Sequence, residues 1–186
     1  MFPHTESRRV RLDPATADSA REAMLGTLLR TGIESLRPSD GPAGLMANAC
    51  AAFLVRQRAS GSVLGFSVLH GLNPAGHVKC GIYLDPERTR LGLGAEAAHL
   101  TYNYAFAVFA IEKVIVQTTQ ASFASFGLKD NAPRKTAVLE DHLYFRGRHW
   151  DLHTYEIRRE EWEYRVRRQL DDRLLPHARS WRISPG

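Results

Sequence analysis

Few cysteines, few lysines and no long apolar run set the first limits on this chain. Its two cysteines, Cys50 and Cys80, have neither a C-x-x-C nor a zinc-ligand spacing, so they suit a reducing compartment and predict no metal. No stretch approaches the roughly 20 apolar residues that span a bilayer, and the first residues lack the apolar segment of a signal peptide. We therefore expect a soluble, cytoplasmic protein without membrane partners.

The shortage of lysine leaves arginine as the main cation. The chain has 25 Lys+Arg against 20 Asp+Glu, a formal net charge of +5, and only four of these cations are lysines. Arginine suits bidentate contacts with phosphate and stacking on bases, so a polyanionic partner such as tRNA is allowed. The carboxylates interspersed among the arginines equally suit a solvated surface.

The segment from Leu84 to Ala97 has two glycines at a spacing of two, directly between an apolar strand and an alanine-rich helix. Such a layout suits a backbone anion site, because the N–H groups of a first helical turn are exposed and glycine lets a phosphate approach them. The same glycines also suit a tight turn or close packing of the helix. A dinucleotide-binding fold is not favoured, since Ala97 stands where the third glycine would be and a hairpin precedes the segment.

Hydrophobic periodicity predicts a strand, a helix and a three-stranded meander, followed by a helix, a strand, a short helix and a closing hairpin. The predicted strands cover residues 9–14, 51–57, 62–71, 77–84, 113–117, 136–145 and 150–157. The predicted helices cover residues 14–29, 44–49, 93–108, 121–131 and 160–175. The last helix is amphipathic, and we expect it to cover the protein's own core rather than form a two-fold contact. We predict one folded domain over residues 1–162 and a helical extension over 163–186.

This order of elements resembles the GCN5-related N-acetyltransferase superfamily. The segments Gly81-Ile-Tyr-Leu-Asp-Pro86 and Gly92-Leu-Gly-Ala-Glu-Ala97 resemble the coenzyme A loop of its ribosomal-protein alanine N-acetyltransferase-like branch. The closing segments, Asp141-His-Leu-Tyr144, Gly147-Arg-His-Trp-Asp151, Tyr155 and Arg159-Glu-Glu-Trp162, are similar to that branch's last hairpin. The resemblance implies an α+β fold, an α/β/α sandwich with a mixed, mostly antiparallel sheet, a splayed strand pair and flanking helices.

The resemblance also implies acetyl-CoA, or another acyl-CoA, as co-substrate. The residues that it places along the coenzyme are Ile82, Tyr83, Leu84, Arg88, Thr89, Arg90, Leu91, Gly92, Leu93, Gly94 and Ala95. The loop departs from the family at two positions, because Thr89 replaces the usual Arg or Gln and Arg90 replaces the usual Gly. We expect Arg88 or Arg90 to supply the phosphate contact instead.

The usual catalytic glutamate is missing, because the apolar Leu143 aligns with it. Its neighbours Asp141 and His142 are the two candidates for the base, and strand alternation predicts that only one of them points at the acyl group. Ser125 matches a position that relatives use near the coenzyme thiol. The aromatic residues Tyr144 and Trp150 are candidates for the acceptor pocket, with Phe123 and Phe126 less favoured. His70 and Cys80 are expected to be core residues, since a nucleophilic thiol would need a lowered pKa.

Three functions follow from these residues. The first is transfer of an acyl group from acyl-CoA to a primary amine of a peptide N-terminus or a small metabolite by direct attack. The second is an aminoacyltransferase of the same fold that takes its acyl group from aminoacyl-tRNA, which the arginines and the altered loop would suit. The third is a non-catalytic CoA-binding module, suggested by the missing glutamate. The oligomeric state, monomer or homodimer, is open.

Overall fold

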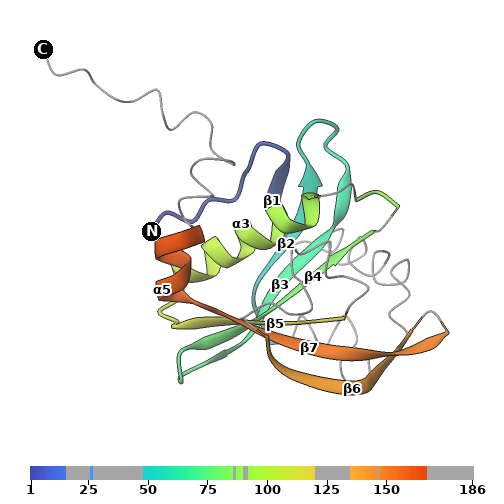
Figure 1. Cartoon of the computed structure of the whole chain (residues 1–186). Coiled ribbons are helices and arrows are strands. Elements are labelled where there is room, and N and C mark those ends of the chain that lie inside the picture. The colour runs from blue at the N-terminus through green and yellow to red at the C-terminus, as the bar shows by residue number, and fades with distance from the viewer. Residues whose placement is uncertain are drawn as a thin grey trace, which may run out of the picture.

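The structure is a computed structural model. It describes residues 1–15, 26, 48–85, 87–89, 92–119, 135–145 and 147–166. Most of the helices predicted over 14–29 and 44–49, and all of the helix predicted over 121–131, lie outside these residues, although Gly26 is described and is helical. The described residues carry one sheet, the long helix after the glycine loop, and the start of the C-terminal helix (Figure 1).

Alternating apolar residues in the first half of the chain form four consecutive antiparallel strands. They are β1 (Val10–Pro14), β2 (Ala49–Gln57), β3 (Val63–Asn73) and β4 (His77–Leu84). The strand β4 has the bounds predicted for it. The strand β2 begins two residues earlier than predicted, at a position assigned to the end of a short helix.

The second half of the chain adds the helix and three more strands. They are α3 (Leu93–Val108), β5 (Lys113–Thr118), β6 (Lys135–Phe145) and β7 (Arg148–Arg158). The seven strands form one sheet in the order β1-β2-β3-β4-β5-β7-β6, and only β4 and β5 run parallel. This is the mixed, mostly antiparallel sheet that the sequence predicts.

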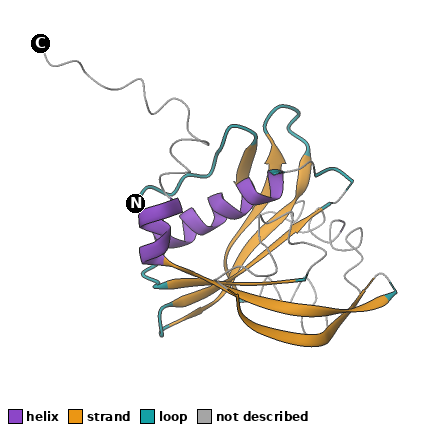
Figure 2. Cartoon of the chain, viewed as in Figure 1, coloured by secondary structure: helices purple, strands orange, loops and turns teal. Residues whose placement is uncertain are grey.

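The helix α3 lies across one face of the sheet, as Figure 2 shows. Its Ala98, Tyr102 and Phe106 pack against alternate residues of β4 and β5. A second cluster joins the first half of α3 to β1 and β3, and includes Leu93 and Leu100. The helix is thereby fixed along its whole length on the strands that precede and follow it, which sets the position of its N-terminus at the end of β4.

The opposite face of the sheet is buried as well. Leu54, Phe66 and Val68 form a separate cluster there, against which Tyr83 of β4 packs. Successive residues of a strand point to opposite faces, so the side chain of Ile82 points toward α3 and that of Tyr83 points away from it. Both faces of β4 are therefore packed, as expected for a sheet between helical layers.

The C-terminal helix begins as predicted, with α5 (Arg159–Glu161) and a π-helical turn (Trp162–Val166), while residues 167–186 lie outside the described part. Trp162, the first residue of the predicted apolar stripe, is 1% exposed and packs edge-on against Tyr102 of α3. Arg159 donates hydrogen bonds to the carbonyl groups of Ile111 and Phe109 just after α3. The start of this helix thus packs within the molecule.

Candidate functional site

The parallel strands β4 and β5 part before β4 ends. β4 pairs with β3 as far as Leu84, but its pairing with β5 stops at Cys80, which faces Val116. β5 continues to Thr118, paired along its other edge with β7, and Figure 1 shows β4 and β5 running apart. Among the described residues, the backbone of 81–84 therefore has no strand on its β5 side. An extended ligand that carries amides can pair with such an edge.

The loop after β4 winds around the buried Asp85. The Asp85 carboxylate accepts a hydrogen bond from the Glu87 N–H at 3.0 Å. The Asp85 carbonyl accepts hydrogen bonds from the N–H groups of Arg88 and Thr89 and from the Thr89 hydroxyl at 2.7 Å. Backbone N–H groups and the Thr89 hydroxyl are therefore the donors that form this turn. None of these hydrogen bonds comes from an arginine side chain.

The helix α3 then begins at a left-handed glycine. Gly92 is its N-cap, with φ 86° and no side-chain cap. The N–H groups of a first helical turn have no acceptor within the helix, and they carry the positive end of its dipole. Because α3 begins where the β4 edge ends, amide acceptors and donors along 81–84 are followed directly by a place for an anion.

An ion pair from the start of the chain lies at this same helix end. The Arg9 guanidinium binds the Glu96 carboxylate, and the Ser7 hydroxyl donates to that carboxylate at 2.6 Å. A Cβ atom at Gly92 would lie 2.9 Å from Arg9 Nη2, so the guanidinium occupies the side-chain position of the N-cap. The sequence analysis did not identify Arg9. The only signal was the acidic Glu96 in the first turn of α3, and its partner lies 87 residues away in the chain.

The predicted coenzyme residues divide by what they offer. Gly92 and Gly94 offer backbone, and the Leu93 side chain is buried in the core beneath α3. Arg88, one of the two cations expected at the phosphates, lies 3.5 Å from the buried Asp85 carboxylate while its own side chain is 55% exposed. Arg90 and Leu91 lie outside the described residues.

On the face away from α3, the Tyr83 ring covers the first residue of the β4 edge. It stacks on Phe66, with 4.8 Å between ring centroids. A Cβ atom at Gly81 would lie 2.9 Å from Tyr83 Cε2, so only glycine leaves room for the ring. Burial, aided by nearby Cys80, raises the pKa of Tyr83 to about 12, so its phenol stays protonated at neutral pH.

The β6–β7 hairpin holds the candidate base residues on a bulge. Leu139 faces Leu152 and Leu143 faces Trp150, so residues 140–142 stand opposite Asp151 alone. Asp141 has φ 49°, and its N–H donates to the Asp151 carboxylate at 3.0 Å. Strict strand alternation does not apply at this point, since a bulge interrupts it, and which of the two side chains points at the acyl group stays a prediction. Both Asp141 and His142 are exposed.

The two aromatic candidates lie on either side of this hairpin. Tyr144 is 47% exposed and meets the His149 ring edge-on at 5.1 Å. Trp150 is half-buried, and the Arg148 guanidinium lies 3.5 Å from its ring centroid. The register pairs Tyr144 with His149 and Trp150 with Leu143, so the two rings lie on opposite faces of the hairpin and only one of them can line a given acceptor pocket. Ser125, Phe123 and Phe126 lie outside the described residues.

Of the two central-strand candidates, Cys80 lies in the core as expected, whereas His70 does so only in part. Cys80 is 4% exposed in the core beside α3, and burial raises the pKa of its thiol, which disfavours a thiolate nucleophile. His70 is half-buried, and burial together with the charge of Lys79 lowers its pKa. In the described part of the chain, no three His, Cys, Asp or Glu side chains gather as metal ligands. No helix there is long and apolar enough to cross a membrane.

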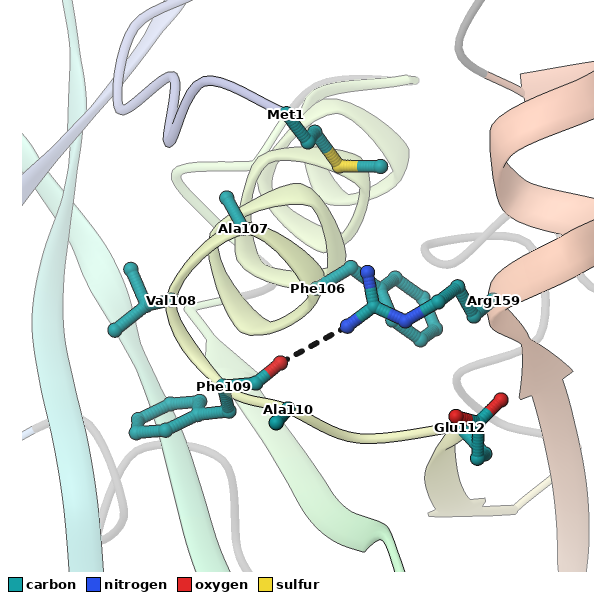
Figure 3. A pocket seen from close by; sticks show the side chains of 8 residues that line it. All are labelled: Met1, Phe106, Ala107, Val108, Phe109, Ala110, Glu112 and Arg159. Carbon is teal, nitrogen blue, oxygen red and sulfur yellow. Dashed lines mark hydrogen bonds between the residues drawn. The ribbon is translucent and has the colours of Figure 1, made fainter.

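A hollow of about 610 Å³ lies at the other end of α3 (Figure 3). Met1, Phe106 and Glu112 line it, together with Arg159, which donates to the Phe109 carbonyl at 2.9 Å. This end of the helix offers carbonyl groups and an arginine that already caps them. The hollow is therefore separate from the anion-binding end at Gly92.

Comparisons with known proteins identify the fold. No family model and no curated protein sequence matches the chain. Among solved structures, a probable GNAT-family acetyltransferase from Chromobacterium violaceum is similar over 86% of this chain and 87% of its own, with TM-score 0.62 and 18% identity. A GCN5-related N-acetyltransferase from Brucella melitensis is similar over 86% and 80%, with TM-score 0.57 and 22% identity.

A third structure, spermidine N-acetyltransferase from Vibrio cholerae in complex with CoA and spermine, is similar over 83% of this chain and 98% of its own. Its TM-score is 0.65 and its identity 15%. These identities are low, so what the chain shares with these structures is the fold. The chain has the fold of the GCN5-related N-acetyltransferases.

Proposed function

We propose that this protein is an N-acyltransferase that moves an acetyl or other acyl group from acyl-CoA to a primary amine. The observation that carries the proposal is the β4 edge at 81–84, which has no β5 partner and leads directly to the N-terminus of α3. The pantetheine arm of CoA carries two amides and is followed by a pyrophosphate. Its chemistry therefore matches an open strand edge followed by an anion site.

The direction of the site follows from the same match. With the pyrophosphate at Gly92, the arm runs back along β4 toward Cys80, where β4 and β5 meet. The acyl group would then lie near Gly81, under the Tyr83 ring on the face away from α3. Holding the thioester in this narrowing gap fixes its carbonyl for in-line attack by the amine, and such positioning supplies much of the rate.

The remaining steps are proton transfers. A neutral amine must form from its ammonium ion, attack the thioester carbonyl and lose a further proton, and the departing thiolate must gain one. We assign proton removal to the hairpin bulge, to Asp141 or His142, directly or through water. Ser125 remains our candidate beside the thiol, and Tyr144 and Trp150 remain our candidates for the acceptor wall.

The acceptor that we propose is an amine of a peptide N-terminus or a small metabolite, as in the ribosomal-protein N-acetyltransferase-like branch. The similar Vibrio cholerae enzyme is named for spermidine, which supports a small amine as the first class to screen. The hairpin wall, with two exposed carboxylates in residues 140–141, also favours a cationic acceptor. The catalytic domain that we propose spans residues 1–162, with 163–186 as an extension.

Transfer from aminoacyl-tRNA is the second candidate. It is favoured by the loop itself, because the Thr89 hydroxyl binds the Asp85 carbonyl and Arg88 lies against the Asp85 carboxylate, so neither is a simple substitute for the usual phosphate ligand. Such a donor would bind through many phosphates, and its affinity would fall steeply with salt. Binding that does not change with salt would exclude it.

The test of the proposed function is acyl transfer with the full chain. Acetyl-CoA is mixed with panels of polyamines, amino acids, aminoglycosides and peptide N-termini, and both thiol release and the mass of the acylated amine are measured. The proposal predicts amine-dependent thiol release that desulfo-CoA inhibits competitively. Tight CoA binding with no transfer to any panel would support a binding module, and absence of CoA binding by calorimetry at millimolar concentration would overturn the proposal.

A further inference from the structure

We infer that Arg9, which immediately precedes β1, is a pyrophosphate-binding residue of the donor site, so that this cation does not come from the glycine loop. The inference rests on the proposed function, because it assigns a new contact within the proposed acyl-CoA site. Its basis is the position of the Arg9 guanidinium beside the N-cap Gly92. Arg9 Nη2 lies 2.9 Å from where a Cβ atom at Gly92 would be.

The ion pair with Glu96 turns the cation outward. The Glu96 side chain is 11% exposed and that of Arg9 is 47% exposed, so the arginine is the more exposed partner of the pair. Glu96 belongs to the first turn of α3, and its carboxylate is held from below by the Ser7 hydroxyl at 2.6 Å. An anion that approaches the helix N-terminus therefore meets the cation before it meets the carboxylate.

The same ion pair holds the guanidinium in place before a ligand binds. An arginine side chain loses rotamer freedom when it is fixed, and here the Glu96 carboxylate has already fixed it. Guanidinium presents five N–H donors in a planar fork, and phosphate oxygens accept from it in pairs. Arg9 is thus poised to add charged donors to the backbone N–H groups of the helix.

This assignment explains the departure of the loop from its family pattern. Thr89 stands where relatives have Arg or Gln, and its hydroxyl binds within the loop. Arg88 lies beside Asp85. A cation at the phosphates can instead come from Arg9, just before β1, because its Nη2 lies 2.9 Å from where a Cβ atom at Gly92 would be.

The experiment compares Arg9→Gln with Arg11→Gln as a matched control. Arg11 lies two residues further along, its side chain is 46% exposed, and it also pairs with a carboxylate, that of Asp13. Affinities for CoA and dephospho-CoA are measured by calorimetry, and kcat/KM is measured with acetyl-CoA and with S-acetylpantetheine, which has no phosphate. Arg9→Lys serves as a second variant that keeps the charge, and thermal melting records whether each variant is folded.

We expect Arg9→Gln to weaken CoA and dephospho-CoA alike by about tenfold, and Arg9→Lys by less, with S-acetylpantetheine turnover unchanged within about twofold. Arg11→Gln should change none of these values by more than about twofold. Equal losses for phosphate-bearing and phosphate-free donors, or no loss at all, would overturn the inference. A loss confined to CoA would also overturn it, since that would place Arg9 at the 3′-phosphate.

Failure of the proposed function and failure of the Arg9 role would give different results. If the unaltered protein binds neither CoA nor dephospho-CoA, the proposed function fails and the inference falls with it. If the unaltered protein binds both and Arg9→Gln, or Arg9→Lys should the first variant not fold, binds them equally well, only the role of Arg9 is lost.

Discussion

The donor end and the hairpin end of the candidate site are held by different forces. At the donor end, the Asp85 turn, the left-handed Gly92 and the Arg9–Glu96 pair fix backbone groups in a partly buried setting. At the hairpin end, Asp141 and His142 are exposed on a bulge, where Asp141 hydrogen-bonds through its N–H to the Asp151 carboxylate and through its carbonyl to His149 Nδ1. We therefore expect the donor end to bind its ligand mainly through backbone groups. The hairpin end instead depends on which side chains are present.

This difference fits the chemistry that we propose for each end. A coenzyme is the same molecule in every turnover, so a rigid cradle of backbone donors loses little freedom on binding. An acceptor varies between enzymes of one fold, and exposed side chains on a bulge can change without disturbing the sheet. Substitutions at the two ends should therefore separate donor affinity from turnover.

The largest effect is expected at Gly65 of β3, which pairs with β4, the strand that carries the open edge. Gly65 has φ 154°, and a Cβ atom there would lie 2.0 Å from the Tyr83 carbonyl oxygen, which is backbone and cannot move aside cheaply. Gly65→Ala should lower the free energy of unfolding by at least about 3 kcal/mol. Urea unfolding measures this change.

Gly61→Ala is the control for that substitution, since Gly61 has φ 70° with open space around it. It should cost only about 1 kcal/mol, the strain of a left-handed alanine. Similar costs for the two variants would show that β3 and β4 are not held as closely as this structure has them.

The next effect tests the hairpin end. The double variant Asp141→Asn/His142→Asn should lower kcat about a hundredfold, because it removes both candidate bases, while the affinity for CoA stays within about twofold. Steady-state kinetics and calorimetry measure the two quantities. Each single variant then shows which residue carries the proton.

Glu140→Gln is the matched control, because it removes a charge from the same exposed bulge without touching a candidate base. It should leave kcat nearly unchanged. If the double variant retains full kcat, proton removal does not run through the hairpin, and the contrast between the two ends loses its chemical meaning.

A smaller and opposite pattern is expected at Gly92. Gly92→Ala introduces strain at φ 86° and places a methyl group 2.9 Å from Arg9 Nη2, too close for contact, so it should weaken CoA about tenfold and change kcat at saturating donor much less. Gly147→Ala has a similar φ, 73°, with open space around it, and should leave CoA affinity unchanged. Equal effects on binding from both variants would mean that Gly92 acts only through its strain.

The smallest effect is on the pH dependence of stability. It arises at His70, which belongs to neither end of the site. Burial and Lys79 lower the pKa of His70 below its ordinary 6.5, so the folded state binds fewer protons there than the unfolded state. Its contribution is fully present above pH 6.5 and is lost as pH falls toward the folded pKa. In His70→Gln, unfolding free energy should fall less between about pH 7 and 5 than in the unaltered chain. A slope that His70→Gln leaves the same would contradict this.

The same contrast decides what the sequence could predict. The strand β4, the glycine turn and the start of α3 follow from local patterns, because alternation, a glycine pair and an alanine-rich stripe each determine backbone conformation nearby. The contact of Arg9 with Glu96 joins residues 87 apart and leaves no local pattern. The bulge at residues 140–142 is likewise set by register against β7, so alternation alone does not determine the faces of Asp141 and His142.

The most direct test of the account is native mass spectrometry of the full chain with acetyl-CoA and, in parallel, with bulk aminoacyl-tRNA. The open β4 edge followed by the anion-binding start of α3 predicts a one-to-one acetyl-CoA adduct. A tRNA adduct without any CoA adduct would contradict the account, because it would mean that the edge and the helix end do not hold the coenzyme.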